Sequence, residues 1–321
     1  MTRIFDAHFD FLSEITSQRN MGNTKVFEKD FYPNLKKGGI KFIVASIYLQ
    51  DHLLRNPFYH AMEQIGYLHE ELRESPELIS LIRTKEDLES CLASDKIGII
   101  LSFEGTEPLL KPQDLYTFYE LGVRLMGLTW SRRNIYADGC DFTEGLKKGG
   151  LSKKGFELID VAKKLGVIID ISHLSDEGLE DLLELDIPLI ASHSNAYSLT
   201  PTPRNLKDRY LDKLSKKDFF LGVNGAQFII TRDGKSSSPE DYRAHTKYLV
   251  NKLGPDKVGF GLDLCDCLNV FSSPNAVPTD VIGDHSQAQE LIECLEEEFE
   301  PALVEKLALT NLYDFLKKHL P

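Results

Sequence analysis

The chain has 321 residues, of which 42% are hydrophobic and 27% charged, an ordinary composition for a globular protein. Its formal net charge is −13, and no segment combines clustered Lys and Arg with aromatic residues, so a nucleic-acid ligand is excluded. No apolar run approaches the roughly 18 residues of a membrane span, and the N-terminus lacks a signal-peptide run, so we expect no membrane association.

Short, nearly continuous apolar segments alternate with amphipathic segments along the chain. Parallel strands that are covered on both faces have this continuous apolar character, so the segments predict buried parallel strands. The predicted strands are residues 3–8, 40–48, 96–104, 123–130, 167–173, 188–194, 219–226 and 257–264. Eight strands with helical crossovers predict a single α/β domain over residues 1–321, a (β/α)8 barrel of the TIM type.

The intervening segments carry the start and stop signals of helices. Residues 152–166, 175–185 and 239–254 begin at Ser or Pro, and the first and last of these end at Gly. The segment 49–95 is longer than one crossover needs, so it is predicted to hold two helices. The five cysteines are odd in number and scattered, which favours reduced thiols and a cytoplasmic location over a disulfide framework.

Polar side chains recur where the predicted strands end. His8 and Asp10 close the first strand two residues apart, so they point to the same side. The carboxyl ends of barrel strands form one rim, where active sites lie. The further residues at this rim are Glu104, Trp130, His173, His193, Asn224 and Asp263. The other six of the nine histidines are predicted on helix or loop surfaces and receive no role; they are His52, His60, His69, His245, His285 and His319.

Imidazole and carboxylate groups at one rim suit a pair of zinc ions with an open position for water. Two metals about 3.5–4 Å apart need a ligand that spans both, and a carboxylate has two oxygens for this purpose. Glu104 is the predicted bridge, and Asp263 remains as a proton acceptor. The predicted ligand sets are His8, Asp10 and Glu104 for one ion, and Glu104, His173 and His193 for the other.

Each of these residues also has a structural explanation. His173 and His193 precede helices and could serve in turns or caps. Glu104 could bind backbone at a turn, and Asp263 could cap the last helix. We favour the metal interpretation, because the alternative requires a separate structural explanation for every one of these residues at the same time.

Six ordered blocks extend over nearly the whole chain: DAHFD, LSFEGTEPL, GVRLMGLTW, GVIIDISHLS, LIASHSNAYSLTPTPRNLKD and VGFGLDL. Together they resemble the membrane dipeptidase (renal dipeptidase) family of zinc metallopeptidases. The most specific block is SHSNAYSLTPTPRN, in which an Arg-Asn pair follows the histidine by eleven and twelve residues.

The resemblance implies a metallo-dependent hydrolase barrel with two Zn²⁺ that cleaves dipeptides, including those with a C-terminal D-residue. It implies that Arg204 contacts the substrate carboxylate and that Asp263 handles the proton. Trp130 and Asn224 are assigned to substrate binding. The ligands carried over by motif are His8, Asp10, Glu104, His173 and His193. The expected partner is a small dipeptide, and a homodimer is left open.

Two departures from the family pattern concern the substrate side. Trp130 stands where many members have a histidine, and an indole N–H donates a hydrogen bond but does not titrate. The usual DFDG appears as DLCD, which keeps Asp263 but changes its neighbours. Two alternatives therefore stay open: a dizinc hydrolase of another acyl bond (a lactone, a β-lactam or an N-acyl amino acid), and a barrel that binds metal or peptide without catalysis.

Overall fold

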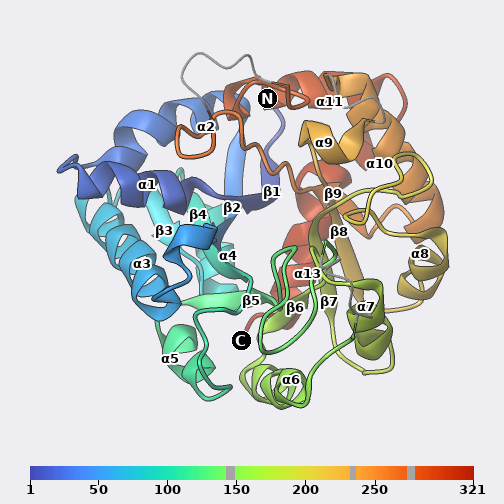
Figure 1. The fold of residues 1–321 in the computed structure, drawn as a ribbon. Helices are drawn as coiled ribbons and strands as arrows, with labels where there is room; N and C mark the ends of the chain where they lie inside the picture. The colour runs from blue at the N-terminus through green and yellow to red at the C-terminus, as the bar shows by residue number, and fades with distance from the viewer. Residues whose placement is uncertain (142–148, 232–235, 273–278) are drawn as a thin grey trace.

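The computed structural model contains a closed parallel barrel and describes residues 1–141, 149–231, 236–272 and 279–321. Neighbouring strands follow the order β2-β1-β9-β8-β7-β6-β5-β4, and pairing of β2 with β4 closes the ring. Figure 1 shows the strands at the centre with the helices arranged around them. The barrel strands are β1 (Ile4–Phe9), β2 (Ile40–Ile47), β4 (Ile97–Glu104), β5 (Val123–Gly127), β6 (Ile168–Asp170), β7 (Leu189–Ser194), β8 (Phe219–Val223) and β9 (Val258–Phe260). The predicted (β/α)8 fold is confirmed.

A ninth strand, β3 (Ile79–Leu81), was missed by the sequence analysis. It pairs with Ile97–Ile99 at the start of β4, whereas β5 pairs with β4 only from Leu101 onward. Three residues are too few to show a strand period, so the sequence carried little signal for it. The two helices predicted in this segment are present as α3 (Pro57–Glu74) and α4 (Lys85–Leu92).

The remaining helical elements lie around the barrel and across one end of it. Ser152 and Ser175 cap helices at the predicted starts, Ser238 caps the helix predicted to begin at Pro239, and Gly166 ends α6 in a left-handed conformation. These elements are α1 (Phe11–Asn20), η1 (Phe27–Phe31), α2 (Tyr32–Gly38), η2 (Asp51–Leu53), α5 (Asp114–Glu120), α6 (Lys153–Leu165), α7 (Asp176–Leu183), α8 (Asp208–Leu214), α9 (Gln227–Ile230), α10 (Pro239–Leu253), η3 (His285–Gln287), α11 (Ala288–Glu296), α12 (Pro301–Glu305), η4 (Lys306–Thr310) and α13 (Asn311–His319). No helix among the described residues has the length and hydropathy needed to cross a bilayer.

Apolar side chains fill the amino-terminal end of the barrel. Phe5, Phe42 and Phe220 come from the first half of their strands and pack in one cluster with Phe315 and Leu316 of α13. This helix closes that end of the barrel with a hydrophobic plug. Polar side chains of the strands are therefore gathered at the opposite, carboxyl-terminal end.

Two strands, β6 and β9, end earlier than predicted, and each is followed by a residue with an unusual backbone conformation. β6 ends at Asp170 rather than residue 173, and β9 ends at Phe260 rather than residue 264. His173 and Asp263, just beyond these ends, have positive φ angles of 65° and 53°. A residue with a side chain rarely adopts this left-handed conformation, because it costs about 1–3 kcal/mol. Such a residue cannot continue the extended backbone of a strand. Such strain is typical of residues held for a function.

Candidate metal centre

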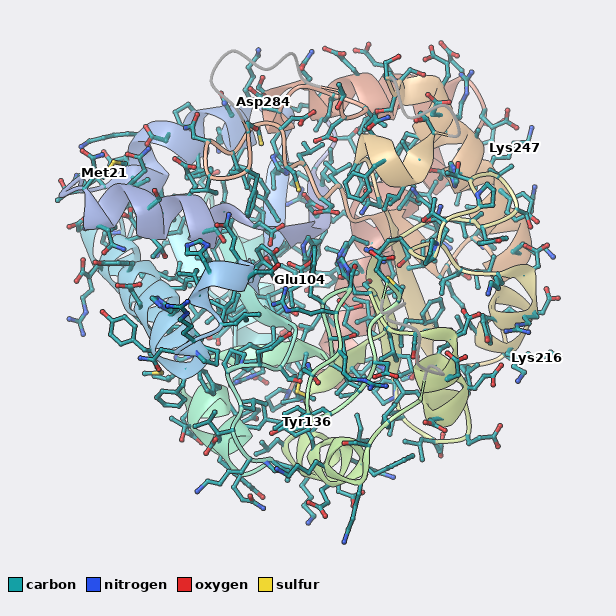
Figure 2. The ribbon with its side chains drawn as sticks, viewed as in Figure 1. Met21, Glu104, Tyr136, Lys216, Lys247 and Asp284 are labelled. Atoms are coloured by element: carbon teal, nitrogen blue, oxygen red, sulfur yellow. The ribbon has the colours of Figure 1, made fainter. Side chains whose placement is uncertain are left out.

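Six ionisable side chains converge at the carboxyl-terminal end of the barrel. β1 supplies His8, β4 supplies Glu104 and β7 supplies His193. Asp10 directly follows β1, and His173 and Asp263 lie three residues beyond the ends of β6 and β9. All six are buried. Figure 2 places Glu104 near the centre of the ring of strands. The predicted meeting of these residues at one rim is what the structure shows.

Glu104 lies between two groups of imidazoles. Its Oε2 is 3.6 Å from His8 Nε2, and its Oε1 is 2.9 Å from His173 Nε2 and 3.7 Å from His193 Nε2. Burial and the neighbouring Asp10 raise the pKa of Glu104 well above its ordinary value. One carboxylate therefore presents its two oxygens to two different sets of ligand atoms, as a bridge between two cations requires.

His8 faces three carboxylates at once. Its Nε2 lies 3.4 Å from Asp10 Oδ2 and 3.8 Å from Asp263 Oδ1, in addition to the contact with Glu104. Burial lowers the pKa of His8, but the charges of Asp10 and Glu104 outweigh it and raise that pKa well above 6.5. The concentration of negative charge around one imidazole favours a cation at this point.

His173 and His193 are oriented by hydroxyl groups. Ser131 Oγ lies 2.8 Å from His173 Nδ1, and Ser192 Oγ lies 2.6 Å from His193 Nδ1. The two Nε2 atoms are thereby turned inward, 2.9 Å from each other. Burial lowers the pKa of both histidines well below 6.5, which keeps them in the neutral form that binds metals.

The residues fit a divalent metal pair. Buried His8 Nε2 has no hydrogen-bond partner among the described residues, an expensive condition that a metal ion relieves. In each of two sets the three ligand atoms lie within 4.8 Å of one another: His8, Glu104 and His193 in one, and His8, Asp10 and Asp263 in the other. The predicted sets were His8, Asp10 and Glu104, and Glu104, His173 and His193. The structure therefore brings His193 and Asp263 close to His8, and His173 belongs to neither set.

Two buried aspartates that the sequence analysis missed join the strand ends beneath this cluster. Asp6 Oδ1 accepts the backbone N–H groups of His8 and Leu262, at 3.3 and 2.8 Å. Asp170 Oδ1 accepts those of Ser172 and Ser192, at 2.9 and 3.0 Å. Each aspartate links two neighbouring strands where the regular ladder ends. A carboxylate inside an apolar strand was the available signal, because such a group must find partners when buried.

Two histidines assigned to the surface are in fact buried, so that prediction was wrong. His285 lies 2.8 Å from Asp6 Oδ2 and completes the partners of that carboxylate. His245 Nδ1 accepts the backbone N–H of Ala196, and its Nε2 lies 3.1 Å from Ile230 O. Both belong to helical segments that pack inward, which the local sequence pattern did not reveal.

Asn224 lies behind Asp263 rather than in contact with the cavity. It is completely buried, and its Nδ2 donates to Asp263 Oδ2 at 2.7 Å. Its backbone N–H donates to Asn195 Oδ1. Asn224 therefore orients the carboxylate of Asp263, and its contact with substrate stays a prediction.

Arg204 is buried in the loop that follows β7, with its guanidinium at the cavity wall. Its Nη2 donates to His193 O at 3.0 Å, and its Nε has no partner among the described residues. A buried, unpaired N–H donor on a cation is costly unless an anion binds it. The structure thus places a local positive charge beside the cluster of an acidic protein.

Four of the six clustered residues, Asp10, Glu104, His173 and Asp263, form the floor of a cavity of about 500 Å³. Trp130 lies in its wall and its ring stacks against that of His173, with centroids 5.7 Å apart. The residues that line the cavity are Asp10, Tyr48, Glu104, Trp130, Ser131, Asp141, His173, Thr202, Pro203, Arg204, Phe228, Ile229, Asp263, Cys265 and Phe271. This volume suits a small molecule.

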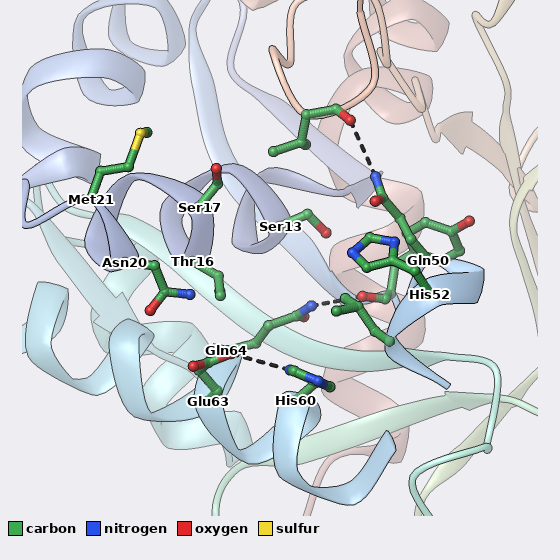
Figure 3. Close-up of a pocket in the computed structure, with 13 residues that line it drawn as sticks. Ser13, Thr16, Ser17, Asn20, Met21, Gln50, His52, His60, Glu63 and Gln64 are labelled. Atoms are coloured by element: carbon green, nitrogen blue, oxygen red, sulfur yellow. Dashed lines mark hydrogen bonds and ion pairs between the residues drawn. The ribbon is translucent and has the colours of Figure 1, made fainter. Parts of the chain in front are cut away.

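A second cavity of about 410 Å³ lies between α1, η2 and α3 and shares Tyr48 with the first. Figure 3 shows its polar lining, including Gln50, His60 and Gln64. His60 is paired with Glu63, and Gln64 donates to Tyr48 O at 2.7 Å. None of the six clustered ionisable residues lines this cavity, so the chemistry is assigned to the first.

Comparison with known proteins agrees with this geometry. The sequence profile described as "Membrane dipeptidase (Peptidase family M19)" matches residues 1–319. The chain belongs to this family. The family that the sequence blocks indicated is thereby confirmed.

Curated relatives include "Dipeptidase tcpJ" of Claviceps purpurea, 26% identical over 82% of this chain, and "Dipeptidase verJ" of Clonostachys rogersoniana, 30% identical over 63% of it. The alignments span 66% and 52% of those two proteins. Among solved structures, a family M19 metallopeptidase described as dipeptidase AC superposes with a TM-score of 0.87 at 26% identity, covering 99% of both chains. A Rhodobacter sphaeroides metallopeptidase bound to a phosphinate mimic of L-Ala-D-Ala gives 0.86 at 25% identity, covering 100% of this chain and 99% of its own.

Replacement of Glu104 tests whether one carboxylate holds both metal positions. We expect Glu104→Ala to lose most of the bound metal, because each ion loses a ligand, while circular dichroism shows an intact fold. Glu107→Ala is the matched control, since this partly buried carboxylate three residues after Glu104 pairs with Arg132 instead. Elemental analysis after zinc loading measures the difference. Full retention of metal by Glu104→Ala would show that another group is the bridge.

Proposed function

We propose that this protein is a dinuclear zinc dipeptidase that hydrolyses the peptide bond of dipeptides, including those with a C-terminal D-residue. The observation that carries the proposal is the placement of Glu104 between His8 and the His173–His193 pair, on the floor of a cavity walled by Arg204. Mixed imidazole and carboxylate ligands favour zinc. The Rhodobacter sphaeroides neighbour, whose ligand mimics L-Ala-D-Ala, supports the substrate class and its stereochemistry.

Two bound zinc ions would supply the Lewis acidity that polarises the scissile carbonyl and lowers the pKa of water. The protein residues then have separate tasks. His8, Asp10, Glu104, His173 and His193 would hold the metals. The serines that fix the two later histidines keep the ligand atoms in place.

Asp263 moves the proton in this scheme. Asn224 occupies its Oδ2, while Oδ1 points toward the cluster, 3.8 Å from His8 Nε2. Burial raises the pKa of Asp263, which makes its carboxylate a better proton acceptor. Oδ1 accepts the proton of the attacking water and returns it to the leaving amine, so the residue acts first as general base and then as general acid.

Arg204 binds the terminal carboxylate of the substrate. The planar guanidinium forms two parallel hydrogen bonds to a carboxylate, a geometry that a lysine ammonium does not reproduce. Arg204 lines the cavity, and its guanidinium keeps one hydrogen-bond donor, Nε, without a partner among the described residues. This local cation explains how a chain of net charge −13 can hold an anionic substrate.

Metal dependence and substrate class are tested together with the purified protein. Three forms of the protein are incubated with a panel of L,L and L,D dipeptides: the protein before metal removal, the chelated protein, and the protein after zinc is restored. We expect hydrolysis of both series, its loss on chelation, and its recovery with about two equivalents of zinc. Full activity in metal-free protein would rule out the proposed mechanism.

Arg204→Ala separates a dipeptidase from a general acyl hydrolase. A charge-assisted pair is worth roughly 1.5–3 kcal/mol, so we expect kcat/KM for dipeptides to fall about 10- to 150-fold. Arg204→Lys should restore only part of this loss. Dipeptide amides, which lack the carboxylate, should be poor substrates whose turnover changes little.

The control for Arg204 is Arg209→Ala, because Arg209 is an exposed arginine nearby in sequence that pairs with Asp176. It should leave both substrate types unaffected. Equal losses for dipeptides and amides in Arg204→Ala would favour the dizinc hydrolase of another acyl bond, with Arg204 stabilising its loop through the contact with His193 O.

A further inference from the structure

Three aromatic residues form one continuous side of the catalytic cavity. The ring centroids of Tyr48 and Trp130 are 5.6 Å apart, and those of Tyr48 and Phe271 are 5.8 Å apart. All three side chains are partly exposed and line the cavity. We call this set the aromatic wall. Its surface is large and apolar, in contrast to the charged floor beside it.

The aromatic wall is held in place from behind. The guanidinium carbon of Arg132 lies 5.2 Å from the Trp130 ring centroid. Arg132 is itself fixed, because its Nε donates to Glu107 at 3.0 Å and its Nη2 to Leu49 O at 3.0 Å. Trp130 also stacks on His173. The indole is therefore positioned before any ligand binds, so little ordering is required when one does.

The aromatic wall and Arg204 line the same cavity, and Tyr48 lies across the barrel mouth from the strand that leads to Arg204. Tyr48 directly follows β2, and β2 and β7 lie four positions apart in either direction around the eight-stranded ring. Arg204 follows β7. Trp130 follows β5, which is two positions from β2, and Phe271 contacts Tyr48 from the chain beyond β9. Tyr48 thus lies opposite the strand that leads to the arginine, while Trp130 and Phe271 follow strands that are two positions from both β2 and β7.

Other apolar residues lie on the arginine's own side. Asn205, next to Arg204, donates to Ile229 O at 2.7 Å, and Phe228 and Ile229 line the cavity there. Phe228 is 59% exposed. A dipeptide with its carboxylate on Arg204 would therefore place its C-terminal side chain near Phe228 and extend its N-terminal residue toward Tyr48 and the rest of the aromatic wall.

We infer that the aromatic wall binds the side chain of the substrate's N-terminal residue, with Trp130 as the residue that sets specificity. This inference rests on the proposed dipeptidase function and names its substrate class: dipeptides whose N-terminal residue is large and apolar, such as Leu or Phe. Such a side chain displaces water from the aromatic surface. Full burial of a side chain of this size corresponds to a preference over Gly of about tenfold or more in kcat/KM.

The test uses two series of dipeptides with the zinc-loaded protein: X-Gly and Gly-X, in which X is Gly, Ala, Leu, Phe or Lys. We expect wild type to favour Leu and Phe in the X-Gly series, mainly through KM. Trp130→Ala should reduce that preference about tenfold, and Trp130→Phe should retain part of it. Phe228→Ala is the directional control, since it should change the Gly-X series and leave the X-Gly ranking intact.

A second readout does not depend on turnover. Trp130 is the only tryptophan of the chain, so tryptophan fluorescence, excited at a wavelength where tyrosine does not absorb, reports on the aromatic wall alone. Titration with a phosphinate mimic of Phe-Gly should change the emission with the same midpoint as its inhibition. The Trp130 ring stacks on His173, so its removal could disturb the metal centre, and metal analysis of each variant measures this. If Trp130→Ala loses metal, Trp130→Phe serves in its place, because it keeps an aromatic ring beside His173.

The possible outcomes are distinct. Hydrolysis of dipeptides without an N-terminal preference, or with one that survives in Trp130→Ala, overturns the inference and leaves the proposed function standing. Inhibitor binding without a change in emission also overturns it. Absence of hydrolysis of every dipeptide by the metal-loaded protein overturns the proposed function and this inference with it.

Discussion

The structure depends on a buried carboxylate, Glu104, held among imidazoles at the end of a barrel strand. Removing such a charge from water is costly unless partners compensate it. Asp10 and Asp263 add further carboxylates within 4 Å of His8 Nε2, and His8 is the imidazole they share. Divalent cations would relieve this excess of negative charge in a buried site. Two cations on either side of Glu104, as we propose, would account for ligands that come from so many separate strands.

The same rule governs the layer beneath the ligands. The regular strand ladder stops where His173 and Asp263 adopt left-handed backbone conformations, and backbone N–H groups near those points need other acceptors. Asp6 and Asp170 supply them, and His285 in turn satisfies Asp6. Local strain at the rim is thus supported by buried polar contacts just below it, while the plug formed by α13 stabilises the opposite end.

The parts of the fold that follow from local pattern could be predicted, and those that depend on tertiary contacts could not. The eight barrel strands have strong apolar runs, and the rim of the barrel brings His8, Glu104 and His193 together wherever those runs end. The exact strand ends could not be predicted, because positive φ angles at two rim residues leave no sequence pattern. The burial of His245 and the contact of Asn224 with Asp263 likewise arise only when helices and loops pack.

The central claim is that two metal ions flank Glu104, and anomalous X-ray diffraction from crystals of the zinc-loaded protein at the zinc edge tests it most directly. The account predicts two anomalous peaks about 3.5–4 Å apart, one on each side of the Glu104 carboxylate. His8 should ligate one ion, and His173 and His193 the other. A single peak, or peaks away from Glu104, would contradict the account.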